Sequence, residues 1–175
     1  MNSLFLNQNI LLKNIFKAGV AMEKDIHKTN RPAKLMHSFW KLQKSIMKQV
    51  KQTAIHHDLS IPQFAILVIM QHNREIAQKK LQERTHYPKS TLSYAIEGLV
   101  QAKLIHRTHV EGNRREMNLA LSSEGKALLD KMKMEEKGIH MRFKNAVNSL
   151  SEEQFTGLIN MHQHLTMFFD SEEIK

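Results

Sequence analysis

The segment LIHRTHVEGNRREMNLAL, residues 104–121, is the stretch that decides the fold. Its two ends, LIHRTHV and EMNLAL, have the composition and alternation of strands. Gly112 and Asn113 lie between them and are typical of a tight turn. The segment therefore predicts a β-hairpin whose second strand has one apolar face, made of Met117, Leu119 and Leu121.

Helical patterns precede the hairpin. Apolar residues recur every three or four positions from Pro32 to His57, and the run from Phe64 to Met70 is apolar on nearly every side. Ser60 and Gln63 have the spacing of a capping box and predict where the second of these helices begins. Two shorter helical patterns follow, IAQKKLQERTHY and PKSTLSYAIEGLVQAK.

Helical patterns also follow the hairpin. Ser122 is placed to cap a long helix that continues through Leu150, and Ser151 with Gln154 predicts the start of a last helix through Phe169. A helix, a tight turn, a second helix and a hairpin form a winged helix-turn-helix. The predicted fold class is thus mainly α with a small β-hairpin, a winged helix-turn-helix domain with N- and C-terminal helices.

The charge balance indicates a polyanionic partner. Twenty-six lysines and arginines exceed 17 acidic residues, giving a net charge of +9 and an isoelectric point near 9.8. Residues 74–115 carry nine lysines and arginines against four glutamates, a net +5, whereas residues 149–175 carry a net −4. The predicted helix-turn-helix therefore carries a net positive charge, whereas the C-terminal segment is poorly suited to contact phosphates.

Several chemical functions find no support in the sequence. The absence of cysteine excludes disulfides, thiolate nucleophiles and cysteine-ligated zinc. The chain has no P-loop, G-x-S-x-G or H-E-x-x-H motif, so we assign no catalytic residue, expect no enzyme and predict no cofactor. The histidine pairs in AIHHD and MHQHL lack the i, i+4 spacing of two metal ligands on one helix face, so we predict no metal site.

Residues 1–31 form an N-terminal extension to the helical patterns. The first 21 residues are mildly apolar, but Lys13 and Lys17 interrupt any run long enough to span a membrane, so we expect a cytoplasmic protein without a membrane partner. Codons for KAGVAM can spell a ribosome-binding sequence, so we hypothesise that translation begins at Met22 rather than Met1. The mass of the native N-terminus would decide between the two.

Over roughly Leu35 to Leu165 the sequence resembles the MarR family of winged helix-turn-helix transcriptional regulators. The segments that carry this resemblance are LSIPQFAIL, KSTLSYAIEGLVQAKLIHR and NRREMNLALSSEGKALL, and the spacing between the last two also fits. The resemblance implies a winged helix-turn-helix region at 59–122 and dimerisation helices at 32–58 and 123–175.

The resemblance also implies which residues contact DNA. The family presents side chains to the major groove at the positions of Lys89, Ser90, Thr91, Ser93 and Tyr94. Its wing arginine, which enters the adjacent minor groove, corresponds to Arg115, with Arg114 beside it. Three positions depart from the usual pattern: Asn113 replaces an aspartate, Lys103 a glycine and Tyr94 an arginine.

The function implied is that of a homodimer that binds a pseudo-palindromic operator in double-stranded DNA. The family's repressors are released by a small aromatic or lipophilic effector, and no residue of this sequence identifies such a ligand or its binding site. The alternative is a winged helix that binds a protein partner without specific DNA contacts. Two roles stay open for Arg107, a phosphate contact or a structural role on its strand, and for Glu97 we expect a structural ion pair.

Overall fold

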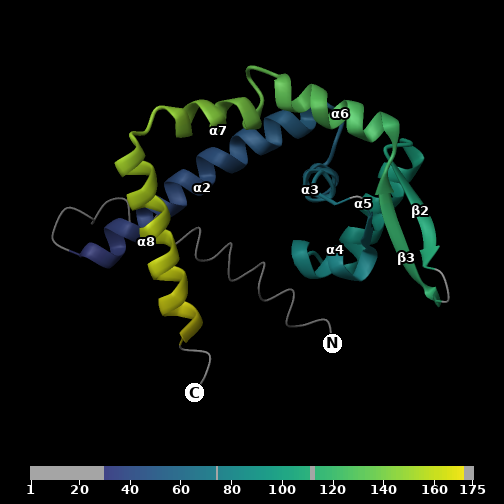
Figure 1. The fold of residues 1–175 in the computed structure, drawn as a ribbon, viewed down its shortest axis with the longest axis horizontal. Coiled ribbons are helices and arrows are strands. Elements are labelled where there is room, and N and C mark those ends of the chain that lie inside the picture. The colour runs from purple at the N-terminus through teal and green to yellow at the C-terminus, as the bar shows by residue number, and fades with distance from the viewer. Residues whose placement is uncertain (1–29, 74, 111–112, 172–175) are drawn as a thin grey trace. The chain divides into compact units, whose positions relative to one another are not determined.

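The computed structural model describes residues 30–73, 75–110 and 113–171, and at 109–110 and 113–116 it describes the backbone alone. Within these residues it contains seven helices and three strands (Figure 1). In chain order they are α2 (Arg31–His56), α3 (Ile61–Met70), β1 (Glu75–Ala77), α4 (Gln78–Thr85), α5 (Lys89–Gln101), β2 (Ile105–Val110), β3 (Asn113–Leu121), α6 (Ser123–Met134), α7 (Ile139–Asn148) and α8 (Glu152–Asp170). The chain divides into two compact units between Lys131 and Met132.

Both predicted capping boxes are confirmed. At the start of α3 the Ser60 amide donates to Oε1 of Gln63 at 2.8 Å, and the Gln63 amide donates to Oγ of Ser60 at 3.3 Å. Ser151 and Gln154 make the same reciprocal pair at the start of α8, at 2.9 and 3.2 Å. These caps satisfy amides that have no acceptor inside the helix and so fix where each helix begins.

The predicted hairpin is present as β2 and β3, which run side by side in Figure 1. The turn prediction was partly wrong, because Asn113 lies in β3, paired with Val110. The other half of the predicted turn, Gly112, lies outside the described residues. A third strand, β1, was also missed: the order is β1-β3-β2, and Ile76 of β1 pairs with Leu119. Both residues are buried, so this pairing joins the sheet to the core.

The core of the first unit is formed by α3, α4, α5 and the sheet. Each of these elements contributes at least one of the largest completely buried side chains. They are Ile66, Leu67, Met70, Leu81, Leu92, Ile96, Leu99, Ile105 and Leu119, and α6 adds Leu129. Burial of these side chains away from water is the main force that holds α5 in place.

The long helix predicted from Ser122 through Leu150 is two helices, α6 and α7. The start is confirmed, since the Gly125 amide donates to Oγ of Ser122 at 2.9 Å. The break falls at Gly138, which is extended with ψ of 157° and whose amide donates to the Glu135 carbonyl at 2.9 Å. A Cβ at position 138 would lie only 3.1 Å from that carbonyl oxygen, so the turn favours glycine.

Helices α7 and α8 contain no buried residue in one chain.

Among the described residues, no single helix is long and apolar enough to cross a membrane. Helices α2 and α3 pass that test only as a pair bent by 93°. A core helix passes the same test, and four residues of α3 are buried in the core of the first unit.

Candidate nucleic-acid interface

The helix-turn-helix consists of α4, a turn of residues 86–88, and α5. The chain reverses at His86, whose φ of 51° is left-handed. The Thr85 hydroxyl donates to the Leu81 carbonyl at 2.9 Å and accepts from the Tyr87 amide at 3.4 Å, which holds the turn against the end of α4. Burial raises the pKa of Tyr87 above its ordinary value.

Helix α5 has one buried face and one exposed face. The buried face consists of Leu92, Ala95, Ile96 and Leu99, each at most 2% exposed. The residues predicted to contact DNA lie in the first two turns: Lys89, Ser90 and Tyr94 are exposed, and Thr91 and Ser93 are half-buried. Tyr94 is 85% exposed and is thus a large aromatic side chain held in water by a firmly packed helix.

The N-terminus of α5 is preceded by Pro88, which makes no side-chain cap hydrogen bond. The first amides of a helix have no acceptor within the helix, and together they carry a partial positive charge. Ser90 and Thr91 lie in this first turn and add hydroxyl groups that can donate to a phosphate or a base edge. The N-terminal end of α5 therefore presents hydrogen-bond donors and a partial positive charge, which suit the phosphates of a nucleic acid.

Glu97 and Arg107 form the ion pair expected for Glu97. Arg107 donates from Nη1 to Oε2 of Glu97 at 2.9 Å, and Gln101 donates from Nε2 to Oε1 of Glu97 at 3.4 Å. The pair joins α5 to β2 and supplies the cation that neutralises Glu97. Of the two roles left open for Arg107, this geometry supports the structural one.

Lys103 occupies the left-handed position that ends α5, with φ of 59°. Its amide donates to the Val100 carbonyl and the Leu104 amide donates to the Leu99 carbonyl, each at 2.9 Å, which together form a Schellman motif. The cap therefore takes the form that usually contains glycine. A residue with a side chain adopts it here at a cost of about 1 kcal/mol.

Ser122 connects this end of α5 to α6. Its hydroxyl donates to the Lys103 carbonyl at 2.7 Å and accepts from the Gly125 amide at 2.9 Å, while its amide donates to the Leu104 carbonyl at 3.1 Å. A Cβ at position 125 would collide with the Leu104 carbonyl oxygen, so α6 approaches the backbone closely at this point. The cap at Ser122 was predicted from the sequence, but its contact with Lys103 was not, because the two residues lie 19 positions apart.

The predicted wing arginines, Arg114 and Arg115, lie on β3 directly after its first residue, Asn113. Their side chains, like Arg74, lie outside the described residues. Their backbone positions put both arginines near the loop that joins β2 to β3. Their contact with DNA stays a prediction.

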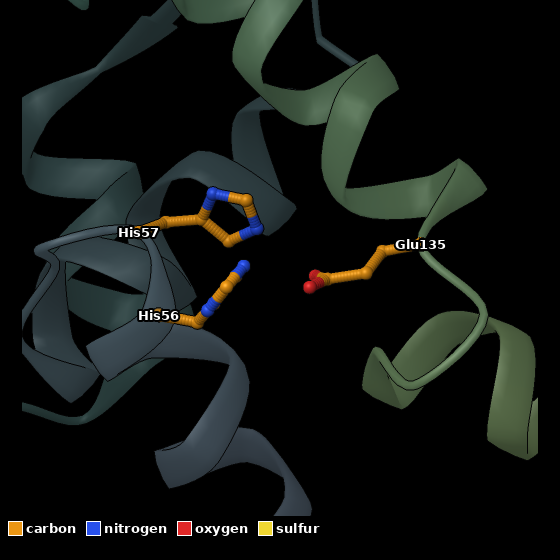
Figure 2. A group of neighbouring side chains, drawn as sticks. All are labelled: His56, His57 and Glu135. Carbon is orange, nitrogen blue, oxygen red and sulfur yellow. The ribbon is translucent and has the colours of Figure 1, made fainter.

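Figure 2 shows three side chains that carry metal-binding atoms, His56, His57 and Glu135. The two histidines are neighbours at the end of α2, and their rings meet edge to face with centroids 5.0 Å apart. Glu135 belongs to the second compact unit. The three residues therefore do not make a site within either unit, and we assign no metal ligand.

Comparison with known proteins relates the chain to bacterial regulators. The sequence model of a family described as MarR family matches residues 57–116. The chain is 25% identical over 138 residues to the HTH-type transcriptional regulator SarZ of Staphylococcus aureus strain MRSA252, covering 78% of this chain and 90% of SarZ. For SarZ of strain NCTC 8325 / PS 47 the identity is 26% over 90 residues, covering 51% of this chain and 61% of SarZ.

Two solved structures show the same fold. The structure of NadR in complex with 4-hydroxyphenylacetate has a TM-score of 0.64 at 17% identity, covering 80% of this chain and 97% of NadR. A mutant MarR from E. coli complexed with operator DNA has a TM-score of 0.63 at 14% identity, covering 78% of this chain and 96% of MarR. At these identities the likeness concerns the fold.

Proposed function

We propose that this chain, which belongs to the MarR family, is a homodimeric transcriptional regulator that binds double-stranded DNA in a sequence-specific manner. Family membership is the premise, since the matched residues 57–116 extend from the end of α2 into β3. The observation that carries the proposal is the exposed face of α5. Lys89, Ser90 and Tyr94 point away from a core that holds the opposite face of the helix rigidly.

An exposed helix face of this kind suits the major groove of DNA. The groove admits an α-helix, and base edges there can be told apart by hydrogen bonds and apolar contacts. Lys89 and the hydroxyls of Ser90, Thr91 and Ser93 are donors for phosphates or bases, while the Tyr94 ring can contact a thymine methyl group. Arg114 and Arg115 would reach an adjacent groove from the hairpin, whose strand of nine residues is about 30 Å long.

The operator should be pseudo-palindromic because the regulator acts as a dimer. One recognition helix covers only a few base pairs, and a two-fold dimer places two such helices in half-sites about one helical turn apart. Helices α2, α7 and α8 supply the dimerisation surface in this proposal. Each of them leaves large apolar side chains exposed in a single chain.

We assign the chain a repressor role that a small aromatic or lipophilic effector relieves. The solved NadR relative holds 4-hydroxyphenylacetate, which is a molecule of this class. Such a ligand can lower DNA affinity only if it binds the two conformations of the regulator with different affinity. A regulator of this kind acts on the chromosome, so we place it in the cytoplasm.

The test is selection of bound sequences from a pool of random duplexes, followed by titration of the selected and a scrambled duplex at several salt concentrations. We expect a two-fold motif, and affinity that falls by a factor on the order of a thousand between about 50 and 200 mM salt. Enrichment of no motif, together with salt-independent capture of a protein partner, would instead establish the protein-binding alternative.

A further inference from the structure

Helix α2 has an unusual charge pattern. It contains six lysines and arginines and no acidic residue among its 26 residues. Five of these cations are exposed lysines, and we call them the lysine stripe: Lys34, Lys41, Lys44, Lys48 and Lys51. No ion pair to another described residue neutralises any of the five.

The five lysines share one side of the helix. Because successive residues of an α-helix are 100° apart, they fall within an arc of roughly 100° over about 25 Å of helix length. The two buried residues of α2, Thr53 and Ala54, lie on the other side, where the helix packs on α3. The lysine stripe is therefore a continuous positive surface that faces away from the core.

We propose that the lysine stripe is a second DNA-binding surface, which contacts phosphates independently of sequence while α5 contacts bases. This inference rests on the proposed function, because it assumes a DNA-binding regulator. A line of point charges without acidic neighbours matches the closely spaced phosphates of a duplex. Lysine binds a phosphate without demanding the fixed geometry of arginine, so such contacts add affinity without sequence preference.

Two other occupants fit less well. A protein partner would favour arginine and aromatic anchors, and lysine is depleted from the centres of protein interfaces. An anionic membrane would require the apolar side of α2 to insert among lipids. The C-terminal end of that side packs on α3 at Thr53 and Ala54, and the proposed function assigns its exposed apolar residues to the dimer interface.

Site-specific cross-linking tests the location of the contact. Because the chain has no cysteine, a single Lys44→Cys variant can be labelled with a thiol-linked photo-cross-linker at that position alone. Ser90→Cys in α5 is the positive control for the proposed function, and Lys131→Cys in α6 is the control for an exposed lysine elsewhere. We expect Ser90→Cys and Lys44→Cys to cross-link to duplex DNA, and Lys131→Cys not to do so.

The outcomes separate the two proposals. Cross-linking from position 90 without cross-linking from position 44 would overturn the stripe and leave the regulator intact. Equal cross-linking from positions 44 and 131 would overturn the stripe as well, because it would show contact without localisation. Cross-linking from neither position 90 nor 44 would overturn the proposed function and the stripe together.

Binding measurements test the energetic role. The triple variant Lys41→Gln, Lys44→Gln and Lys48→Gln removes three charges of the stripe, and Lys126→Gln, Lys131→Gln and Lys137→Gln removes the same charge elsewhere. The stripe variant should bind the selected and scrambled duplexes about tenfold more weakly at 0.1 M salt, with a shallower salt dependence. Equal losses in both triple variants would overturn the stripe, as would cosedimentation with phosphatidylglycerol vesicles that only the stripe variant loses.

Discussion

Exposure of large apolar side chains differs between two regions of the molecule. One is the winged-helix region, residues 59–122, and the other consists of the terminal helices α2, α7 and α8. In the winged-helix region the core closes within one chain, and Tyr94 is the one large apolar residue exposed among the side chains described there. The terminal helices leave a long series exposed: Leu35, Met36, Leu42, Met47, Ile55, Phe143, Phe155, Leu158, Ile159, Met161, Met167, Phe168 and Phe169. Apolar surface on this scale is typical of an interaction site, which supports the proposed role of the terminal helices in dimerisation.

The largest effect should come from opening the closed core. Leu99 is completely buried in α5, and we expect Leu99→Ala to lower the free energy of unfolding by about 2–5 kcal/mol through lost contacts and a cavity. Urea denaturation followed by circular dichroism measures the change. Tyr94→Ala in the same helix is the control and should change stability by less than about 0.5 kcal/mol. A loss below about 1 kcal/mol for Leu99→Ala would contradict the closed core.

The next largest effect should be on dimerisation through the terminal helices. Leu158→Glu places a charge in the exposed apolar series of α8 and should weaken dimerisation by about 2–3 kcal/mol, because the charge would be buried at the interface. Sedimentation measures the mass. Asn160→Asp adds the same charge on the side of α8 where the neighbours one turn away, Thr156 and His164, are polar, and should leave the dimer intact. An unchanged dimer in Leu158→Glu would remove α8 from the interface.

Substitution of a wing arginine tests whether the winged-helix region also makes the contacts with DNA. Arg115→Ala should weaken operator binding by about 1–3 kcal/mol while the dimer mass and helix content stay as they are. Arg142→Ala, an exposed arginine of α7, is the matched control. Fluorescence anisotropy with a labelled operator gives both affinities, and equal affinity of Arg115→Ala and the parent would refute the wing assignment.

Tyr94 is the exposed large apolar residue of the winged-helix region, and its exposure predicts a role in contacting DNA rather than in stabilising the fold. Tyr94→Ala should reduce the preference for the operator over a scrambled duplex by about tenfold, or roughly 1.4 kcal/mol, with a smaller change in non-specific affinity. Competition binding measures the ratio. Equal losses on both duplexes would show that Tyr94 does not contact bases.

The smallest change should be a gain in stability. Lys103→Gly removes a side chain from a left-handed position and should raise the free energy of unfolding by up to about 1 kcal/mol. The neighbouring Ala102→Gly is the control, since its φ of −73° is ordinary and glycine there should lower stability. A loss of stability in Lys103→Gly would show that the lysine side chain contributes more than its backbone strain costs.

Local signals in the sequence predicted most of the fold. The two capping boxes, at Ser60 and Ser151, each depend on residues three positions apart, and both are confirmed. The hairpin follows from alternation on either side of a short loop, and the family resemblance is confirmed by the match over residues 57–116. These features depend on neighbouring residues alone, which is why sequence pattern sufficed.

What the sequence did not predict depends on distant contacts. Strand β1 has three residues, too few for a visible alternation, and forms because Ile76 meets Leu119. The break between α6 and α7 is the exception, because it depends on a local turn in which the Gly138 amide donates to the Glu135 carbonyl. The role of Arg107 stayed open because Glu97 lies ten positions away across a chain reversal.

The candidate site is predictable only in part. The positions on α5 came from the family resemblance, and their exposure in the structure supports them, whereas contact with DNA is still a prediction. The lysine stripe was missed, although its spacing is visible in the sequence. Its significance depends on all five lysines being exposed on one side of a helix without acids.

The corner at Ser122 works as a rigid joint. The Ser122 hydroxyl bonds both to the Lys103 carbonyl at the end of α5 and to the Gly125 amide in the first turn of α6. At Gly125 the helix lies so close to the Leu104 carbonyl that a side chain would not fit. The end of α5 and the first turn of α6 are therefore held together by a single serine hydroxyl, with no side chain at position 125 to separate them.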